Sequence, residues 1–149
     1  MSHQRSFKRP ESVLVLVYTT VGEVLVLRRR APPDFWQSVT GSLEWDENDP
    51  LDTARRELDE ETGITPVELH NCGVINRFAI LPQWRHRYQE GVTENTEYLI
   101  LAQLPQRVPV RLNPNEHSEY CWLPRREAAE RMTSWTNREA VLRFVPEGS

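Results

Sequence analysis

Runs of apolar residues predict several strands in the first third of the chain. Residues 12–20 are mostly apolar and β-branched, a pattern typical of a strand that is buried on both faces. The turn residues Val21-Gly22 separate this run from residues 23–30, which again resemble a strand, so the two segments are predicted to form a hairpin. The paired prolines within residues 31–36 predict a loop, because proline cannot continue a hydrogen-bonded ladder. Residues 37–44 then predict another short strand.

The clearest helical pattern runs from Asp49 to Thr62. Asp49 can cap the first turn, Pro50 suits the first helical position, and Gly63 suits the left-handed conformation in which many helices end. Residues spaced three and four apart form one apolar stripe, namely Leu51, Ala54 and Leu58. The segment is therefore predicted to be a helix that packs on one side.

Strands and helices also alternate in the rest of the chain. The pattern predicts strands within residues 66–81, 93–104 and 119–124, and helices within residues 126–132 and 137–145. No repeat, low-complexity tract or linker divides the sequence, so residues 1–149 are predicted to form a single domain. The expected fold class is α/β, with a mixed central sheet between helices in an α/β/α sandwich.

Composition narrows the function classes. The chain has 22 acidic and 18 basic residues, a net charge of −4, which argues against a general nucleic-acid-binding protein. A small phosphorylated ligand needs only a local cluster of cations, and an acidic protein that binds an anion favours a divalent cation as mediator.

Cysteine content and the N-terminus predict a cytoplasmic protein. The two cysteines, Cys72 and Cys121, have neither zinc-site spacing nor the numbers of a disulfide framework, so they are expected to be reduced and to pack as small apolar residues. The N-terminal residues contain no apolar run of the kind found in signal peptides, and no segment is long enough to span a membrane. No membrane partner is expected.

Three carboxylates follow one another on the predicted central helix. With about 3.6 residues per turn, Glu57, Glu60 and Glu61 share a face, whereas Leu58 points toward the apolar stripe. Such a face is either a solvated acidic surface or a magnesium site, because Mg²⁺ prefers carboxylate oxygens and retains waters that phosphates can replace. The flanking residues favour the metal site, since Gly41, Glu47 and Arg56 surround the acids in an ordered pattern.

This pattern resembles the signature of the Nudix hydrolases. Five residues separate Gly41 from Glu47, and eight separate Glu47 from the segment Arg56–Ile64, which reads RELDEETGI. The second interval is one residue longer than in the family signature, and the loop before the helix is expected to absorb the insertion. Glu47, which in the family supports the motif arginine, is the residue whose position it puts in question.

The resemblance implies a Nudix fold and attack by a metal-activated water on phosphorus. It makes Glu57 and Glu61 metal ligands and Glu60 either a further ligand or part of the base apparatus, so all three are predicted catalytic residues. Mg²⁺ is the expected cofactor, with Mn²⁺ as the alternative ion.

Flanking segments extend the resemblance from about Lys8 to beyond Asn137. Within the family, FWQSVTGSLE and the RHRY, GVT and NTE segments are similar to bacterial members that release pyrophosphate from dihydroneopterin triphosphate in folate synthesis. That similarity implies Glu116 as a third metal ligand and His117 as a substrate contact. It also implies a pocket lined by Lys8, Arg29, Thr40, Phe78, Ala79, Ile80, Leu81 and Ser134.

Several of these side chains have a structural alternative. Lys8 and Arg29 suit a triphosphate, but they are also ordinary exposed charges, and Phe78 is either a platform for a flat ring or a core residue. The cluster of residues 85–87 either steers phosphates or is a solvated turn. Four tryptophans, Trp36, Trp84, Trp122 and Trp135, are predicted to be packing residues.

Three functions therefore stay open from the sequence. The leading one is hydrolysis of dihydroneopterin triphosphate to the monophosphate and pyrophosphate. The second is a Nudix hydrolase for nucleoside triphosphates, and the third is a domain that binds a phosphorylated ligand as a sensor without turnover. Intact acids at Glu57, Glu60 and Glu61 oppose the sensor, since mutually repelling carboxylates have no purpose without a metal.

Overall fold

The computed structural model describes residues 7–65 and 68–148 of the chain. Within them, one mixed sheet runs in the order β3-β2-β1-β6-β5, with β4 paired to β1 and β7 paired to β2. The strands are β1 (Glu11–Thr19), β2 (Glu23–Arg29), β3 (Trp36–Gln37), β4 (Val39–Ser42), β5 (His70–Ala79), β6 (Glu94–Leu104) and β7 (His117–Pro124). The helices are α1 (Pro50–Thr62), the 3₁₀ helix η2 (Pro82–Arg87), α2 (Arg125–Arg131) and α3 (Trp135–Phe144).

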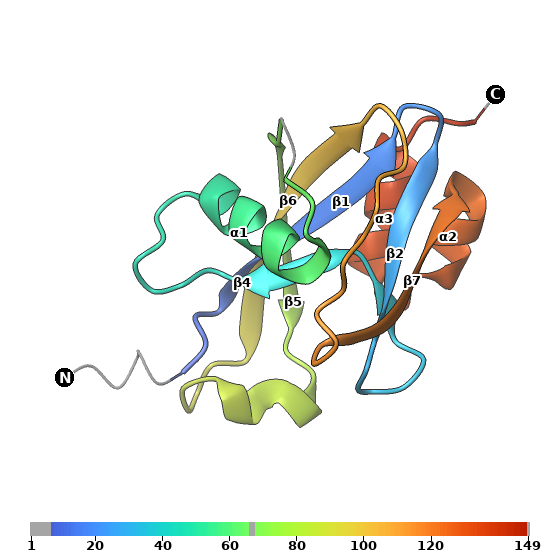
Figure 1. Cartoon of the computed structure of the whole chain (residues 1–149). Helices are drawn as coiled ribbons and strands as arrows, with labels where there is room; N and C mark the ends of the chain where they lie inside the picture. Colours follow the sequence, from blue (N-terminus) through green and yellow to red (C-terminus); the bar gives the residue numbers. More distant parts are fainter. Residues whose placement is uncertain (1–6, 66–67, 149) are drawn as a thin grey trace.

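Helices cover both faces of the sheet, with α1 on one side and α2 and α3 on the other (Figure 1). On the α1 side, Ala54 and Leu58 pack against alternate residues of β1 such as Val13 and Val15. On the other side, the intervening residues of β1 pack against α2 and α3, including Leu14 and Leu16 beneath Ala128, Met132 and Val141. The predicted α/β/α sandwich with a mixed sheet is confirmed.

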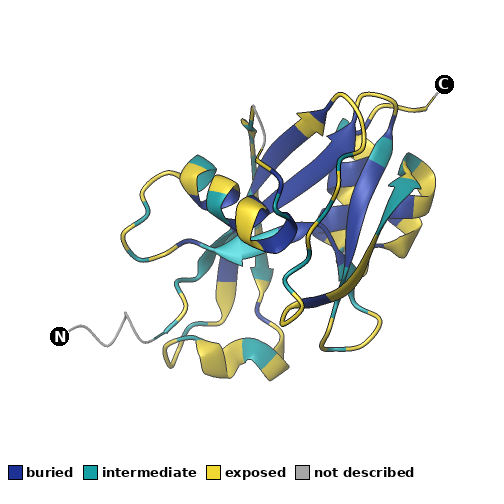
Figure 2. Cartoon of the chain, viewed as in Figure 1, coloured by how far each residue is buried: buried dark blue, intermediate teal, exposed yellow. Residues whose placement is uncertain are grey.

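β1 is the centre of the molecule. It lies parallel to β6 along its whole length, from the pair Glu11↔Thr96 to the pair Thr19↔Leu104. Its side chains from Val13 to Thr19 are buried on both faces, as its continuous apolar run predicted (Figure 2).

The hairpin between β1 and β2 is short. Its turn contains Gly22 at φ 88°, a left-handed conformation that glycine adopts readily, and Tyr18 pairs with Val24 across the two strands. Beyond it, β4 pairs with β1 from Ser12↔Ser42 to Val15↔Val39, while β2 pairs with β7. β2 therefore diverges from β1 and ends at Arg29.

Other boundaries differ in detail from those predicted. Residues 37–44 hold not one strand but the end of β3 and all of β4, separated at Ser38. The predicted strand of residues 66–81 begins only at His70, and residues 66–67 lie outside the described part. Residues 85–87 belong to η2. In the described ranges, no helix combines the length and apolar character that crossing a membrane requires.

Candidate active site

Helix α1 begins and ends where its sequence predicts. Asp49 accepts a hydrogen bond from the Leu51 amide at 2.9 Å, and Gly63 ends the helix in the left-handed region at φ 71°. Leu58 is fully buried in the core. These local interactions set the rotation of the helix about its axis and therefore the direction in which its carboxylates point.

The three carboxylates of α1 lie in different environments. The residue Glu57 is 9% exposed and Glu61 is 4% exposed, both facing the sheet, whereas Glu60 is exposed to solvent. Burial raises the pKa of Glu57 to about 7, although Arg56 opposes the shift with Nη1 2.7 Å from Oε1. The helix therefore presents two desolvated acids and one solvated acid.

Gly41 provides the space that Glu57 occupies. A Cβ atom on Gly41 would lie 2.1 Å from Cδ and 2.4 Å from Oε2 of Glu57, closer than any real contact. The backbone of Gly41 lines the neighbouring pocket, so the bare glycine brings the carboxylate of α1 up to the pocket wall.

Arg56 connects the loop before the helix to these acids. Its Nε lies 3.1 Å from Oε2 of Glu47 and its Nη2 lies 2.9 Å from Oε1, a two-point contact. Arg56 Nη2 also donates to the Ser42 carbonyl at 3.1 Å. The loop absorbs the extra residue between Glu47 and Arg56. Glu47 therefore makes the contact with Arg56 that the insertion put in question.

Replacing Glu47 with glutamine is expected to lower the free energy of unfolding at pH 7 by about 1.5 kcal/mol, the loss of one charge-assisted contact. Hydrogen bonds from Arg56 lower the pKa of Glu47. The stabilisation is therefore present above the ordinary pKa of a glutamate and disappears as the pH falls through the lowered value. Urea unfolding of both proteins should show a difference at pH 7 that vanishes in strong acid.

Glu44→Gln is the matched control for this change. Glu44 is exposed, and its Oε1 lies 3.8 Å from Nη1 of Arg56, so its contribution should be close to zero. An equal decrease in the free energy of unfolding in both variants would show that the contact between Glu47 and Arg56 stabilises the fold no more than the exposed Glu44 does.

His117 lies beneath the pocket surface, next to Glu61. The residue is 3% exposed, its Nδ1 lies 2.9 Å from Oε2 of Glu61, and its Nε2 lies 3.2 Å from Nε2 of Gln37. The amide nitrogen of Gln37 can only donate, so His117 Nε2 accepts there and Nδ1 carries the ring hydrogen, which is not aligned with Oε2 of Glu61. Since His117 is not among the lining residues, its predicted contact with substrate stays a prediction.

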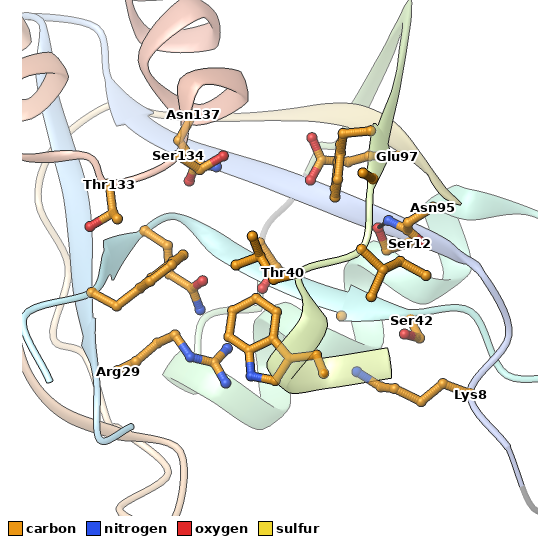
Figure 3. A pocket seen from close by; sticks show the side chains of 18 of the residues that line it. Lys8, Ser12, Arg29, Thr40, Ser42, Asn95, Glu97, Thr133, Ser134 and Asn137 are labelled. Atoms are coloured by element: carbon orange, nitrogen blue, oxygen red, sulfur yellow. Dashed lines mark hydrogen bonds between the residues drawn. The ribbon is translucent and has the colours of Figure 1, made fainter. Parts of the chain in front are cut away.

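A pocket of about 480 Å³ opens beside these residues, on the α3 side of the sheet. Figure 3 shows Lys8 and Arg29 at one end, Glu97 and Asn137 at the other, and Thr40 between them. Except for His117, every residue predicted to bind substrate lines this pocket: Lys8, Arg29, Thr40, Phe78, Ala79, Ile80, Leu81 and Ser134. The tertiary structure thus brings together residues from both ends of the chain.

Three cations crowd one end of the pocket. Burial, followed by repulsion from Arg87 and Arg29, lowers the pKa of Lys8. Burial and Arg87 likewise lower the pKa of Arg29, and its guanidinium stands 5.0 Å from the ring centre of Trp84. Within the described ranges, Lys8, Arg29 and Arg87 form no ion pair. Mutually repelling cations of this kind favour an anionic ligand.

The sequence interpretation missed several lining residues. Trp84 and Trp135 were predicted to pack, yet both line the pocket, and Trp135 is exposed. Asn95 and Glu97 were not singled out, although their alternation with Leu99 and Leu101 on β6 places them on an inward-facing row. That interruption of an apolar row by polar residues is the signal that could have identified them.

The donor set suits a divalent cation. Oε2 of Glu61 is buried and has no aligned hydrogen-bond donor among the described residues, despite the nearby His117. Glu57 and Glu61 are two desolvated carboxylates that repel each other, and a hard cation would offset that cost. The described side chains form no ready-made cluster of three or more metal-ligating groups, so Glu116, which is exposed, stays a predicted ligand.

Charges nevertheless connect Glu116 to the same region. The negative charge of its carboxylate attracts the cations of Lys8 and Arg29 and so opposes the decrease in their pKa values. Glu57 acts on Lys8 in the same way, and Glu61 on Arg29. The predicted ligands and the cationic end of the pocket are therefore within electrostatic reach of each other.

Comparison with known proteins gives consistent matches. The NUDIX domain model matches residues 8–144. The dihydroneopterin triphosphate diphosphatase of Escherichia coli is 43% identical over 144 residues, which cover 93% of this chain and 94% of that protein. The Haemophilus influenzae protein of the same name is 37% identical over 145 residues, which cover 93% and 89%.

A solved structure agrees with these sequence matches. The E. coli dihydroneopterin triphosphate pyrophosphohydrolase has a TM-score of 0.86 and 43% identity to this chain, with coverage of 93% of this chain and 97% of that one. The motif from Gly41 to Ile64 is folded around two buried carboxylates, as described above. With a family match over most of its length, the chain belongs to the Nudix family.

Proposed function

We propose that this protein is a metal-dependent hydrolase that converts dihydroneopterin triphosphate to the monophosphate and pyrophosphate. The observation that carries the proposal is the cationic end of the pocket, formed by Lys8, Arg29 and Arg87, beside the buried carboxylates of α1. Relatives that bear this activity in their names cover nearly the whole chain at 43% and 37% identity, which favours this substrate over a general nucleoside triphosphate.

Glu57 and Glu61 would hold the cation, with Glu116 as the third ligand. We propose Mg²⁺, because carboxylate oxygens suit a hard ion that retains water, and Mn²⁺ is the alternative. When bound, the ion supplies neutralisation of phosphate charge and a more acidic water. Glu60 remains solvated, with Oε2 3.4 Å from Nη1 of Arg56, where its carboxylate can accept a proton from attacking water.

The pocket residues would position the substrate. Lys8, Arg29 and Arg87 bind the charged phosphate oxygens, the arginines through two-point contacts. Thr40 and Ser134 offer hydroxyl groups, and Phe78 offers an aromatic wall for a flat ring. A ligand held at both ends in this way reacts with an entropic advantage, since its phosphates are already oriented toward the acids of α1.

The proposal is tested by pyrophosphate release from dihydroneopterin triphosphate and a panel of nucleoside triphosphates, with Mg²⁺ or with a chelator. We expect a kcat/KM for the pterin at least about tenfold above that for any nucleotide, and no activity without the metal. Broad activity on nucleotides would indicate the second function considered above. Binding without release, in the presence of Mg²⁺, would indicate a sensor.

A further inference from the structure

The inner end of the pocket is polar at positions where the sheet is otherwise apolar. On β6, Leu99 and Leu101 pack beneath α2 and α3, and Glu97 and Asn95 continue the same row into the pocket. Ser12 does the same on β1, one alternation before Leu14. A carboxylate on a buried row is costly, which suggests that it serves a ligand.

Glu97 and Asn95 each keep one unused acceptor atom. The residues are 4% and 5% exposed. Asn76 from β5 and Thr136 from α3 lie close enough to the Glu97 carboxylate to lower its pKa, and the Asn95 amide nitrogen donates to Oγ of Ser12 at 2.8 Å. No described group donates to Oε1 of Glu97 or to Oδ1 of Asn95. The unmet hydrogen-bonding capacity at this end therefore belongs to acceptors, which call for a ligand that donates.

The remainder of the pocket defines the shape of that ligand. Phe78 and Trp135 provide aromatic walls that suit a flat ring, whereas Trp84 lies beside Arg29 at the cationic end. Figure 3 shows Glu97 at the opposite end of the pocket from Lys8 and Arg29. A molecule with its phosphates at the cations would therefore place its ring at Glu97.

We propose that Glu97, assisted by Asn95, recognises the 2-amino-4-oxopyrimidine edge of the substrate ring. This edge offers two adjacent donors, the ring N3–H and the exocyclic amino group, which match a carboxylate and a neighbouring carbonyl oxygen. Pterins and guanine share the edge, whereas hypoxanthine lacks the amino group and adenine presents a ring acceptor. The proposal rests on the proposed function and names the feature by which that pocket selects its substrate.

The direct test is binding of neopterin, a fluorescent pterin without phosphates, to wild type and Glu97→Gln. We expect the variant to bind at least about tenfold more weakly. The glutamine amide offers one acceptor oxygen in place of two, and its NH2 group faces a donor of the pterin ring. Glu94→Gln, an exposed change on the same strand, should bind neopterin like wild type. Equal affinities for wild type and Glu97→Gln would overturn the proposal.

A matched pair of nucleotides separates this proposal from the proposed function. Guanosine and inosine triphosphates differ only in the 2-amino group, so wild type should favour the former in kcat/KM and Glu97→Gln should lose the preference. The decrease in kcat/KM for guanosine triphosphate should appear mainly as an increase in KM, since the scissile phosphates are bound at the other end of the pocket. If wild type failed to hydrolyse dihydroneopterin triphosphate but kept the guanosine preference, the proposed substrate would fail and the recognition site would stand.

Thermal unfolding distinguishes recognition from a structural role. Burial raises the pKa of Glu97 to about 7, and the side chains that lower it, Asn76 and Thr136, are neutral. Arg138 of the same pocket donates instead to the carbonyls of Met132 and Thr133. A raised pKa means that stability present in acid is lost as the pH rises through 7. Glu97→Gln should therefore melt at a higher temperature than wild type at pH 8, with the difference shrinking toward pH 4. A variant less stable at pH 8 would mark Glu97 as a structural residue.

Discussion

Glu61→Gln is expected to lower the kcat of pyrophosphate release by about 100-fold or more while leaving the fold intact. Glu61 is 4% exposed, and its buried Oε2 lies 2.9 Å from Nδ1 of His117 without an aligned donor. Glutamine has the same size but removes the charge that would hold a divalent cation. Since the charge is buried, its removal should not lower the melting temperature, because the desolvation cost disappears with it.

A control variant and a metal-binding measurement accompany this prediction. Asp59→Asn removes one charge from an exposed position of the same helix and should keep wild-type kcat. Mn²⁺ binding, followed by electron paramagnetic resonance without substrate, should weaken in Glu61→Gln but not in Asp59→Asn. Near-wild-type turnover and Mn²⁺ affinity in Glu61→Gln would show that Glu61 is not a ligand.

Gly41→Ala is expected to reduce kcat by about 100-fold through a single methyl group, the size of effect that a displacement of about 1 Å can have at a reacting centre. The new Cβ would lie 2.1 Å from Cδ of Glu57, so the carboxylate must move. Gly41 lies in β4 with a φ outside the left-handed region, so alanine adopts the backbone conformation without strain. Thermal unfolding should therefore change far less than activity.

A double-mutant cycle tests whether Gly41 acts through Glu57. If displacement of the carboxylate explains the loss, Gly41→Ala should add little to the defect of Glu57→Gln, and the two effects should be strongly non-additive. Additive losses would instead mean that the methyl group disturbs the pocket wall, since the Gly41 backbone also lines the cavity. Steady-state kinetics of the four proteins decides between these outcomes.

Local interactions explain why much of this protein can be read from its sequence. Asp49 and Gly63 end α1 through contacts with their own neighbours, and the spacing of Glu57 and Glu61 follows from helix geometry. The continuous apolar run of β1 predicts a central strand, because a strand covered on both faces needs apolar residues at every position. The family motif predicted a role for these acids as well as the contact between Glu47 and Arg56, which the structure contains.

Only the tertiary structure decided which distant residues meet. It placed Gly41 against Glu57, buried His117 beside Glu61, and turned Trp84 and Trp135 into pocket walls. Glu97 lines the pocket because β6 lies between β1 and β5 and because α3 contributes residues to the same pocket. Periodicity in a sequence reports which face of an element a side chain occupies. It does not report what covers that face, because the covering groups come from elements whose order in space is set by sheet pairing.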